Sequence, residues 1–177
     1  MDIIIRIANG SDIIYAQTIA TMLSESAKAR RTGIAPRTPE YLAEKMEEGK
    51  AVVALDGEKI VGFCYMETWE HGKYVANSGL IVHEDYRQRG LGKKIKETIF
   101  NLTRLKYPHA KIFGITTNPV TVKLNTDLGY RQVSFSELTT DQEFWKGCMS
   151  CENYEMLIKT GNRSCLCVGM LYELPEE

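Results

Sequence analysis

A strand, a tight turn and a helix follow one another between residues 79 and 106, and this succession constrains the fold more than any other feature. The apolar run Gly79–Val82 leads through a short polar link into Arg87-Gln88-Arg89-Gly90-Leu91-Gly92-Lys93-Lys94. Apolar residues then recur at helical spacing: Leu91, Ile95, Ile99, Leu102 and Leu105. Glycines at a helix entrance allow close backbone approach and leave N–H groups outward. Together with the helix dipole and the basic side chains, these glycines favour a pyrophosphate site. The alternative is that the glycines only form a tight turn and that the basic side chains are solvated.

Composition predicts one globular domain and excludes several classes of partner. The chain has 177 residues, 44% of them hydrophobic, which is enough for a real core. Its formal net charge of −1 argues against nucleic-acid and membrane-surface partners. No apolar run approaches the ~20 residues of a membrane span, and Met1–Arg6 is too short and acidic for a signal peptide. Five cysteines without an export signal indicate reduced thiols in the cytoplasm.

Alternation, turn residues and caps predict an α/β succession. Strands are expected at Ile3–Ala8, Ala51–Leu55, Lys59–Thr68, Tyr74–Val82, Lys111–Thr117, Arg131–Leu138, Glu152–Lys159 and Ser164–Leu174. One helix is expected after a cap at Ser11 or Asp12, and a second begins at Thr38-Pro39-Glu40. A third runs to about Lys106, and a fourth runs from Asn118-Pro119 to near Gly129.

The glycine loop and the strand before it resemble the acyl-CoA pyrophosphate loop of the GNAT N-acyltransferase superfamily. Ile5-Arg6-x-Ala8 with Asp12 is similar to the usual opening of that family, and Leu128-Gly129-Tyr130 to the Leu-Gly-Phe that ends its fourth helix. The resemblance implies the α/β GNAT fold: a mixed central β-sheet, helices on both faces and a C-terminal strand extension. It implies one domain over residues 1–177, with a core at about 3–159 and an extension at 160–177.

The same resemblance implies how acyl-CoA binds. The family's two central parallel strands splay apart, and pantetheine lies in the gap, here between 74–82 and 111–117. A backbone N–H near Leu80 or Ile81 then serves as oxyanion donor. The implied CoA-binding residues are Leu80, Ile81, Val82, Arg87, Gln88, Arg89, Gly90, Leu91, Gly92, Lys93 and Asn118. Acetyl-CoA or another acyl-CoA, succinyl-CoA included, is the expected co-substrate, and no metal is expected.

The catalytic groups depart from the family pattern. Where many members carry Leu-Tyr as thiolate acid, this chain has Leu124-Asn125. Asn125 can donate a hydrogen bond to sulfur but cannot give up a proton, and a plain surface role is the alternative. Glu67, which shares a strand face with Tyr65, is the first candidate for the general base, and His71 is the second. Deprotonation of the amine through water remains open.

The acceptor is predicted from a basic loop. Gly33-Ile34-x-x-Arg37-Thr38-x-Glu40-x-Leu42 is similar to the substrate loop of N-acetylglutamate synthases, and Trp145-x-x-Cys148-x-x-Cys151 resembles the tail of their short, single-domain members. Arg31 and Arg37 are therefore the predicted substrate-binding residues, because guanidinium pairs carboxylates. The predicted reaction acylates the α-amine of an acidic amino acid, with glutamate the first choice, in arginine biosynthesis. The oligomeric state stays open, with a homodimer as one option.

Two other functions and a metal site compete with this prediction. One rival is acetylation of a protein N-terminus or lysine, and another is a non-catalytic CoA-binding regulatory module. Four cysteines, at 148, 151, 165 and 167, have the residue types of a zinc site. A regular hairpin around Thr160–Arg163 would separate Cys151 from Cys167 by ~17 Å, which favours buried apolar thiols instead.

Overall fold

The computed structural model describes residues 2–30, 37–151, 153–163 and 165–175. Its strands are β1 (Ile3–Ile7), β2 (Ala51–Asp56), β3 (Lys59–Trp69), β4 (Tyr74–Val82), β5 (Lys111–Thr116), β6 (Arg131–Val133) and β7 (Val168–Tyr172). Its α-helices are α1 (Ala16–Arg30), α2 (Pro39–Glu47), α3 (Leu91–Lys106), α4 (Pro119–Asp127), α5 (Gln142–Lys146) and α6 (Tyr154–Lys159). Short 3₁₀ turns are η1 (Gly10–Tyr15), η2 (Glu84–Tyr86), η3 (Phe135–Glu137) and η4 (Gly147–Ser150).

The strands pair in the order β1-β2-β3-β4-β5-β7-β6. β4 and β5 run parallel, with Tyr74–Ala76 paired to Lys111–Phe113. The pairs β1–β2, β2–β3, β5–β7 and β6–β7 are antiparallel. The predicted mixed α/β sheet is therefore confirmed. By packing, the chain forms two compact units, and β3 and β4 each contribute residues to both.

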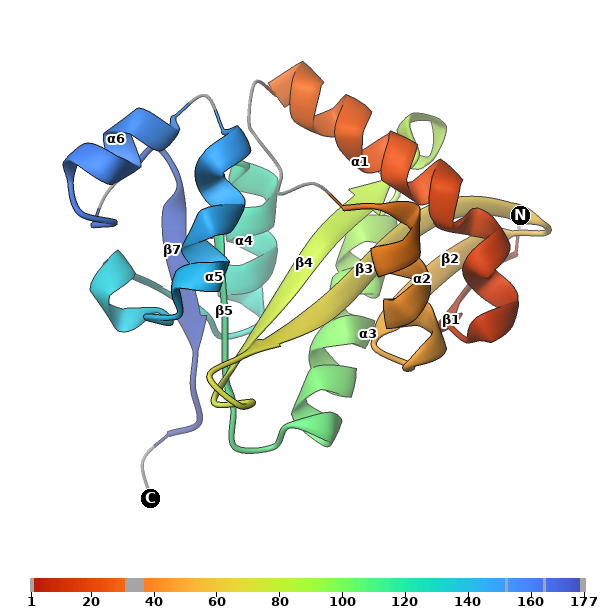
Figure 1. Cartoon of the computed structure of the whole chain (residues 1–177). Helices are drawn as coiled ribbons and strands as arrows, with labels where there is room; N and C mark the ends of the chain where they lie inside the picture. The colour runs from red at the N-terminus through yellow and green to blue at the C-terminus, as the bar shows by residue number, and fades with distance from the viewer. Residues whose placement is uncertain (1, 31–36, 152, 164, 176–177) are drawn as a thin grey trace. The chain divides into compact units, whose positions relative to one another are not determined.

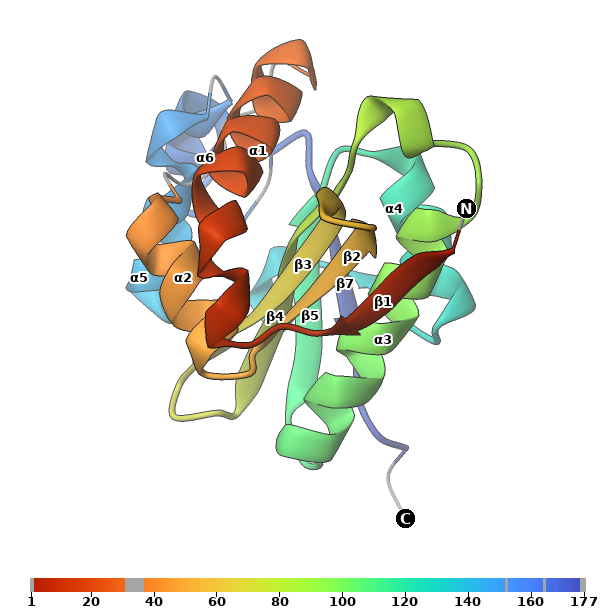
Figure 2. The ribbon, with the colours of Figure 1, turned by 90° about the vertical axis from the view of Figure 1, so that its right-hand side faces the viewer.

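The first unit comprises residues up to 26, 37–67 and 77–106. In it, α1 and α2 cover one face of β1, β2 and β3, and α3 covers the other (Figures 1 and 2). Because both faces are covered, every residue of Ala51–Leu55 is buried, without the alternation of a half-exposed strand. Gly62 lets α3 approach closely, since a Cβ there would lie 2.4 Å from Cδ1 of Ile95.

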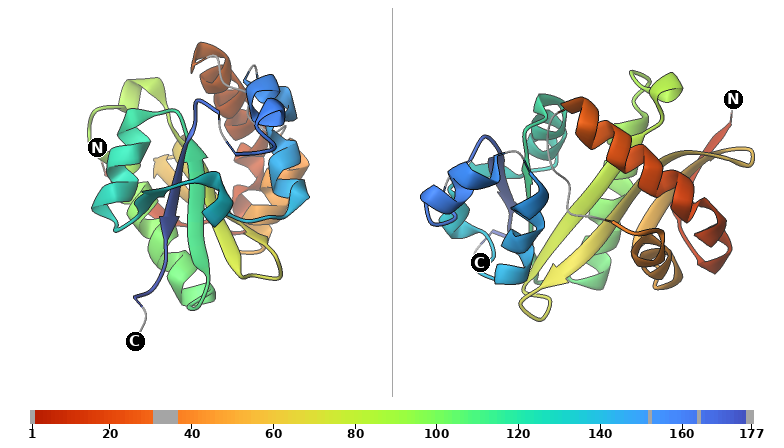
Figure 3. Two further views of the ribbon diagram at one scale, coloured as in Figure 1. Left: turned by 90° about the vertical axis from the view of Figure 1, so that its left-hand side faces the viewer. Right: turned by 45° about the horizontal axis from the view of Figure 1, so that its top comes forward.

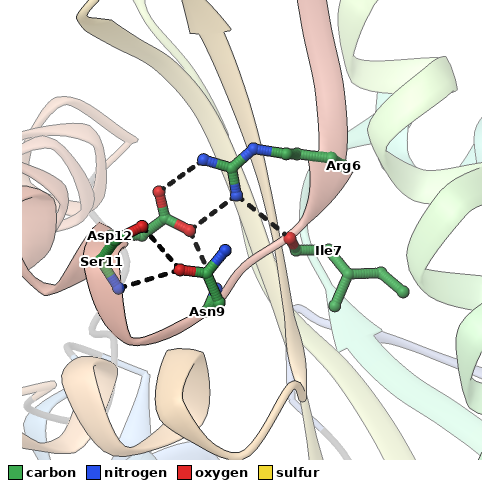
Figure 4. A network of polar contacts seen from close by, with 5 residues as sticks. All are labelled: Arg6, Ile7, Asn9, Ser11 and Asp12. Carbon is green, nitrogen blue, oxygen red and sulfur yellow. Dashed lines mark hydrogen bonds and ion pairs between the residues drawn. The ribbon is translucent and has the colours of Figure 1, made fainter.

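The chain enters the first helical segment through a polar cap that the sequence prediction misplaced. Asn9, rather than Ser11 or Asp12, is the N-cap: its side chain accepts from the Ser11 N–H at 2.9 Å. Asp12 lies one turn in, where it accepts from the Asn9 N–H at 2.9 Å and pairs with Arg6 at 2.7 Å (Figure 4). The helix therefore begins with the 3₁₀ turn η1 before α1.

The second unit comprises residues 27–36, 68–76 and 107–177, of which 31–36, 152, 164 and 176–177 are outside the described residues. Here α4 lies on one side of β5 and β7, and α5 and α6 lie on the other (Figure 3, left). An aromatic core fills the latter side, with Tyr74, Phe113, Phe135, Trp145 and Leu157 all buried. β7 pairs with both β5 and β6, so the predicted C-terminal strand lies inside the sheet.

Two of the predicted strands are wrong, one helix was not predicted, and one leucine is not buried as its spacing predicts. The strand expected over 131–138 ends at Val133, because Ser134 starts the turn η3 and Phe135 enters the aromatic core. Residues 154–159 form helix α6 instead of a strand: Leu157 is buried, whereas Met156 and Ile158 are 42% and 53% exposed. The helix α5 was not predicted. Leu105, expected on the buried face of α3, is 81% exposed.

Of the helices described, none combines the length and the apolar character that a bilayer span needs.

Candidate functional site

The glycine loop joins β4 to α3 through a turn with two positive φ angles. β4 ends at Val82, the turn η2 follows, and α3 begins at Leu91. Gln88 and Gly90 have positive φ angles of 62° and 76°. A Cβ at Gly90 would meet nothing within 4 Å, so conformation, not space, requires glycine there. The first N–H groups of α3 have no partner within the helix, which leaves donors at this turn.

The basic side chains of the loop are exposed, but two of them are already engaged. Arg87 donates from Nε to the Val82 carbonyl oxygen at 3.0 Å, so its guanidinium turns back toward the end of β4. Arg89 lies over the ring of Tyr86, 5.5 Å from its centroid, and Tyr86 in turn donates to Asp56 at 2.7 Å. Lys93 faces solvent, with Glu97 at 4.0 Å. These basic side chains therefore add positive charge around the N-terminus of α3.

A second group of polar side chains lies on the α1–α2 face of β3. Arg37 donates from Nε to the hydroxyl oxygen of Tyr65 at 2.5 Å, and its guanidinium carbon lies 5.4 Å from the Tyr65 ring centroid. Nη1 of Arg37 is buried and has no hydrogen-bond partner among the described residues. A buried guanidinium N–H without an acceptor is costly, so this atom marks where an anionic group would be bound favourably.

Glu67 lies on the same face and has two partners from α2. Tyr41 and Lys45, one helical turn apart, both reach its carboxylate. Tyr41 donates its hydroxyl to Oε2, and Lys45 Nζ lies 2.8 Å from the same oxygen. Burial, together with the nearby Tyr65 and Glu67, raises the pKa of Tyr41, so its hydroxyl stays protonated and can only donate to Glu67. The predicted sharing of one face by Tyr65 and Glu67 is confirmed, and Tyr41 lies edge-on to Tyr65 at 5.6 Å.

The remaining predicted site residues lie in the second unit or outside the described residues. Asn118 caps α4, with its side chain accepting from the Val120 N–H at 3.0 Å. Asn125 is buried and donates to Met170 Sδ at 3.7 Å, so the surface alternative is wrong and its role toward a thiolate stays a prediction. His71 is exposed in the β3–β4 turn with a φ of 56°. Arg31 lies outside the described residues.

The cysteine prediction rested on a hairpin that the structure does not contain. Residues 154–159 are helical, and Cys148, Cys165 and Cys167 all pack against the aromatic core of the second unit. Burial, and then the neighbouring Cys165 and Cys151, raise the pKa of Cys148 to about 11, which keeps it a thiol at neutral pH. Across the described residues, no group of three or more His, Cys, Asp or Glu is arranged to hold a metal ion.

Comparisons with known proteins decide the family. Residues 47–132 match the family model described as an acetyltransferase (GNAT) domain. The chain contains a GNAT acetyltransferase domain. The matched segment runs from the end of α2 to β6 and includes the glycine loop and Glu67. No curated protein sequence matches the chain.

Solved structures share the fold of this GNAT-domain chain at low sequence identity. N-acetylglutamate synthase from Neisseria gonorrhoeae, complexed with CoA and N-acetyl-glutamate, aligns with a TM-score of 0.69, 16% identity and 99% of this chain. The chain spans only 36% of that enzyme's length. A putative acetyltransferase from Salmonella typhimurium with acetyl-CoA aligns with a TM-score of 0.67 and 16% identity, and the alignment covers 100% of this chain and 96% of that one. Arabidopsis thaliana Naa50 with a bisubstrate analogue aligns with a TM-score of 0.62 and 16% identity, and the alignment covers 98% of this chain and 100% of that one.

Sequence reasoning missed three residues of the candidate site. Tyr41 and Lys45, the partners of Glu67, could have been found from their i, i+4 spacing on α2. Gly79 has a φ of 66° in the middle of β4, and an isolated glycine in a strand is itself a signal for a bulge. The pairing of Arg37 with Tyr65 left no signal, because it joins residues 28 positions apart.

Proposed function

We propose that this GNAT acetyltransferase moves the acyl group of acyl-CoA to the α-amine of an acidic amino acid, with glutamate as the leading acceptor. The observation that carries this proposal is the buried Nη1 of Arg37, which lacks a partner among the described residues while Nε is held by Tyr65. A carboxylate would satisfy it with a charge-assisted hydrogen bond. Acylation of glutamate in the cytoplasm would place the enzyme in arginine biosynthesis.

The glycine loop is proposed to bind the pyrophosphate of the donor. The positive φ angles of Gln88 and Gly90, the donors at the start of α3 and the exposed Lys93 support this assignment. Leu80, Ile81 and Val82 would follow the pantetheine arm, and an N–H of Leu80 or Ile81 would stabilise the oxyanion. Asn118 is also proposed as a CoA-binding residue.

Starting from the α-ammonium group, two protons leave the nitrogen, one before attack and one as the amide forms, and one proton reaches the sulfur. As the neutral α-amine attacks the thioester carbonyl, the new N–C bond forms and the C–S bond breaks. Glu67 is proposed to attract the α-ammonium group and to pass a proton of that group to water. Tyr41 and Lys45 hold the Glu67 carboxylate in place for this role. The thiolate then takes a proton, with Asn125 a proposed hydrogen-bond donor or with water alone.

Release of free thiol tests the proposal. Acetyl-CoA and succinyl-CoA would each be offered with glutamate, aspartate, glutamine and a short peptide bearing a free N-terminus. Glutamine is the matched control, because it differs from glutamate only in the charge and donors of the side-chain end. Turnover with glutamate well above that with glutamine and the peptide is expected. Turnover with the peptide alone would make the enzyme a peptide N-acetyltransferase, and CoA binding without any turnover would indicate a regulatory module.

A further inference from the structure

Gly79 brings the ring of Tyr65 directly against the backbone of β4. An ideal Cβ at Gly79 would lie 2.7 Å from Cε1 and 3.0 Å from Cδ1 of that ring, closer than a real Cβ can approach. The φ of 66° also requires glycine at this position. The conformation and the contact thus both require glycine at this position, and the edge of an aromatic ring lies against it.

The Tyr65 ring is fixed on its other sides as well. The residue is 4% exposed and belongs to the apolar core of the first unit. Tyr41 lies edge-on at 5.6 Å, Phe63 is tilted at 6.0 Å, and the hydroxyl accepts from Arg37 Nε at 2.5 Å. A ring held by packing and by a charge-assisted hydrogen bond is a rigid wall, because swinging the ring away about χ1 would break both.

We propose that Tyr65 limits the size of the acyl group and makes acetyl-CoA, rather than succinyl-CoA, the donor. This inference rests on the proposed function, which places the thioester carbonyl at the N–H groups of Leu80 or Ile81. These groups directly follow Gly79, so the acyl carbons beyond the carbonyl meet the ring edge that lies against Gly79. A methyl group fits beside such a wall, whereas the three further carbons of a succinyl group have to displace it.

Arg37 lies at the opposite end of Tyr65 from the ring edge that is proposed to limit the acyl group. Arg37 contacts the hydroxyl end of Tyr65, and Gly79 contacts the ring edge. The unpartnered Nη1 therefore lies on the side of the phenol oxygen and remains for the acceptor's carboxylate. One side chain thereby carries two functions: its edge limits the donor, and its oxygen orients the group that binds the acceptor.

The test compares donors within each variant. For the wild type, kcat/KM is measured with acetyl-, propionyl- and succinyl-CoA, using whichever acceptor the thiol-release panel identifies. Tyr65→Phe keeps the ring and should keep the donor ratio, while raising the KM for glutamate. Tyr65→Ala and Tyr65→Leu should raise the succinyl-to-acetyl ratio by about tenfold or more, since each added methylene is discriminated by roughly that factor. A ratio is independent of the fraction of folded enzyme.

Two results would overturn the inference while leaving the proposed function standing. One is wild-type turnover with succinyl-CoA equal to that with acetyl-CoA. The other is an unchanged donor ratio in both Tyr65→Ala and Tyr65→Leu with clear turnover of glutamate. Conversely, acetyl transfer to a peptide but not to glutamate, with the expected shift in donor ratio, would overturn the acceptor proposal and support the role of Tyr65. Absence of turnover with every donor and acceptor would overturn both.

Discussion

Lys45 and Glu67 form an ion pair on the α2-facing side of β3, with Nζ 2.8 Å from Oε2 and side chains only 7% and 22% exposed. The Tyr41 hydroxyl donates to the same oxygen. One carboxylate thus fixes α2 to the strand that also carries Tyr65. Because Arg37 lies just before α2 and is held by Tyr65, the geometry of the proposed acceptor site depends on this pair.

Lys45→Met should destabilise the protein by about 3 kcal/mol, since removing one partner leaves the other charge largely buried. The double variant Lys45→Met/Glu67→Leu should lose less stability than the two single losses added together, because no charge is left unpaired. Urea unfolding of the wild type, both single variants and the double variant measures the coupling. Additive losses would show that the pair contributes no interaction energy.

Arg37→Ala should raise the KM for glutamate by roughly 10- to 100-fold, the equivalent of one charge-assisted hydrogen bond, and leave the KM for acyl-CoA nearly unchanged. Arg89→Ala should instead raise the KM for acyl-CoA and leave the KM for glutamate nearly unchanged, because Arg89 lies in the glycine loop over Tyr86. Steady-state kinetics with each substrate varied in turn distinguishes the two. Equal effects of Arg37→Ala on both KM values would show that Arg37 does not read the acceptor.

Features with a local cause could be predicted from the sequence, and features with a long-range cause could not. The start of α2 at Thr38-Pro39 and the whole extent of β4 follow from caps and apolar runs, and the structure confirms both. The strand prediction for residues 154–159 was wrong because Leu157 is buried in the aromatic core while Met156 and Ile158 stay exposed. This pattern of burial depends on the assembled fold. Glu67 could be proposed from strand alternation, but its partners Tyr41 and Lys45 come from another element.

Gly79→Ala should destabilise the protein more than Gly90→Ala does. Both glycines have positive φ, which costs an alanine about 1–2 kcal/mol. Only at Gly79 does the new Cβ also strike the Tyr65 ring, which adds about 1–3 kcal/mol of overpacking. Gly90→Asn serves as the control, since asparagine tolerates this conformation. Equal losses for the two alanine variants in thermal or urea unfolding would mean that the Tyr65 ring moves aside at no cost.

Acid should remove the stabilisation that the Arg6–Asp12 pair gives to the start of the first helical segment. The hydrogen bonds from Arg6 hold the pKa of Asp12 below its ordinary value, although burial opposes this. A lowered pKa in the folded state means that the contribution is complete above the unfolded value of about 4 and is lost as the pH falls through the lower, folded value. Asp12→Asn should therefore be less stable than the wild type at pH 6 and approach it in the most acidic buffers. Urea unfolding of both proteins between pH 2.5 and 7 measures this difference, and a gap that stays constant over the whole range would contradict the coupling of the pair to folding.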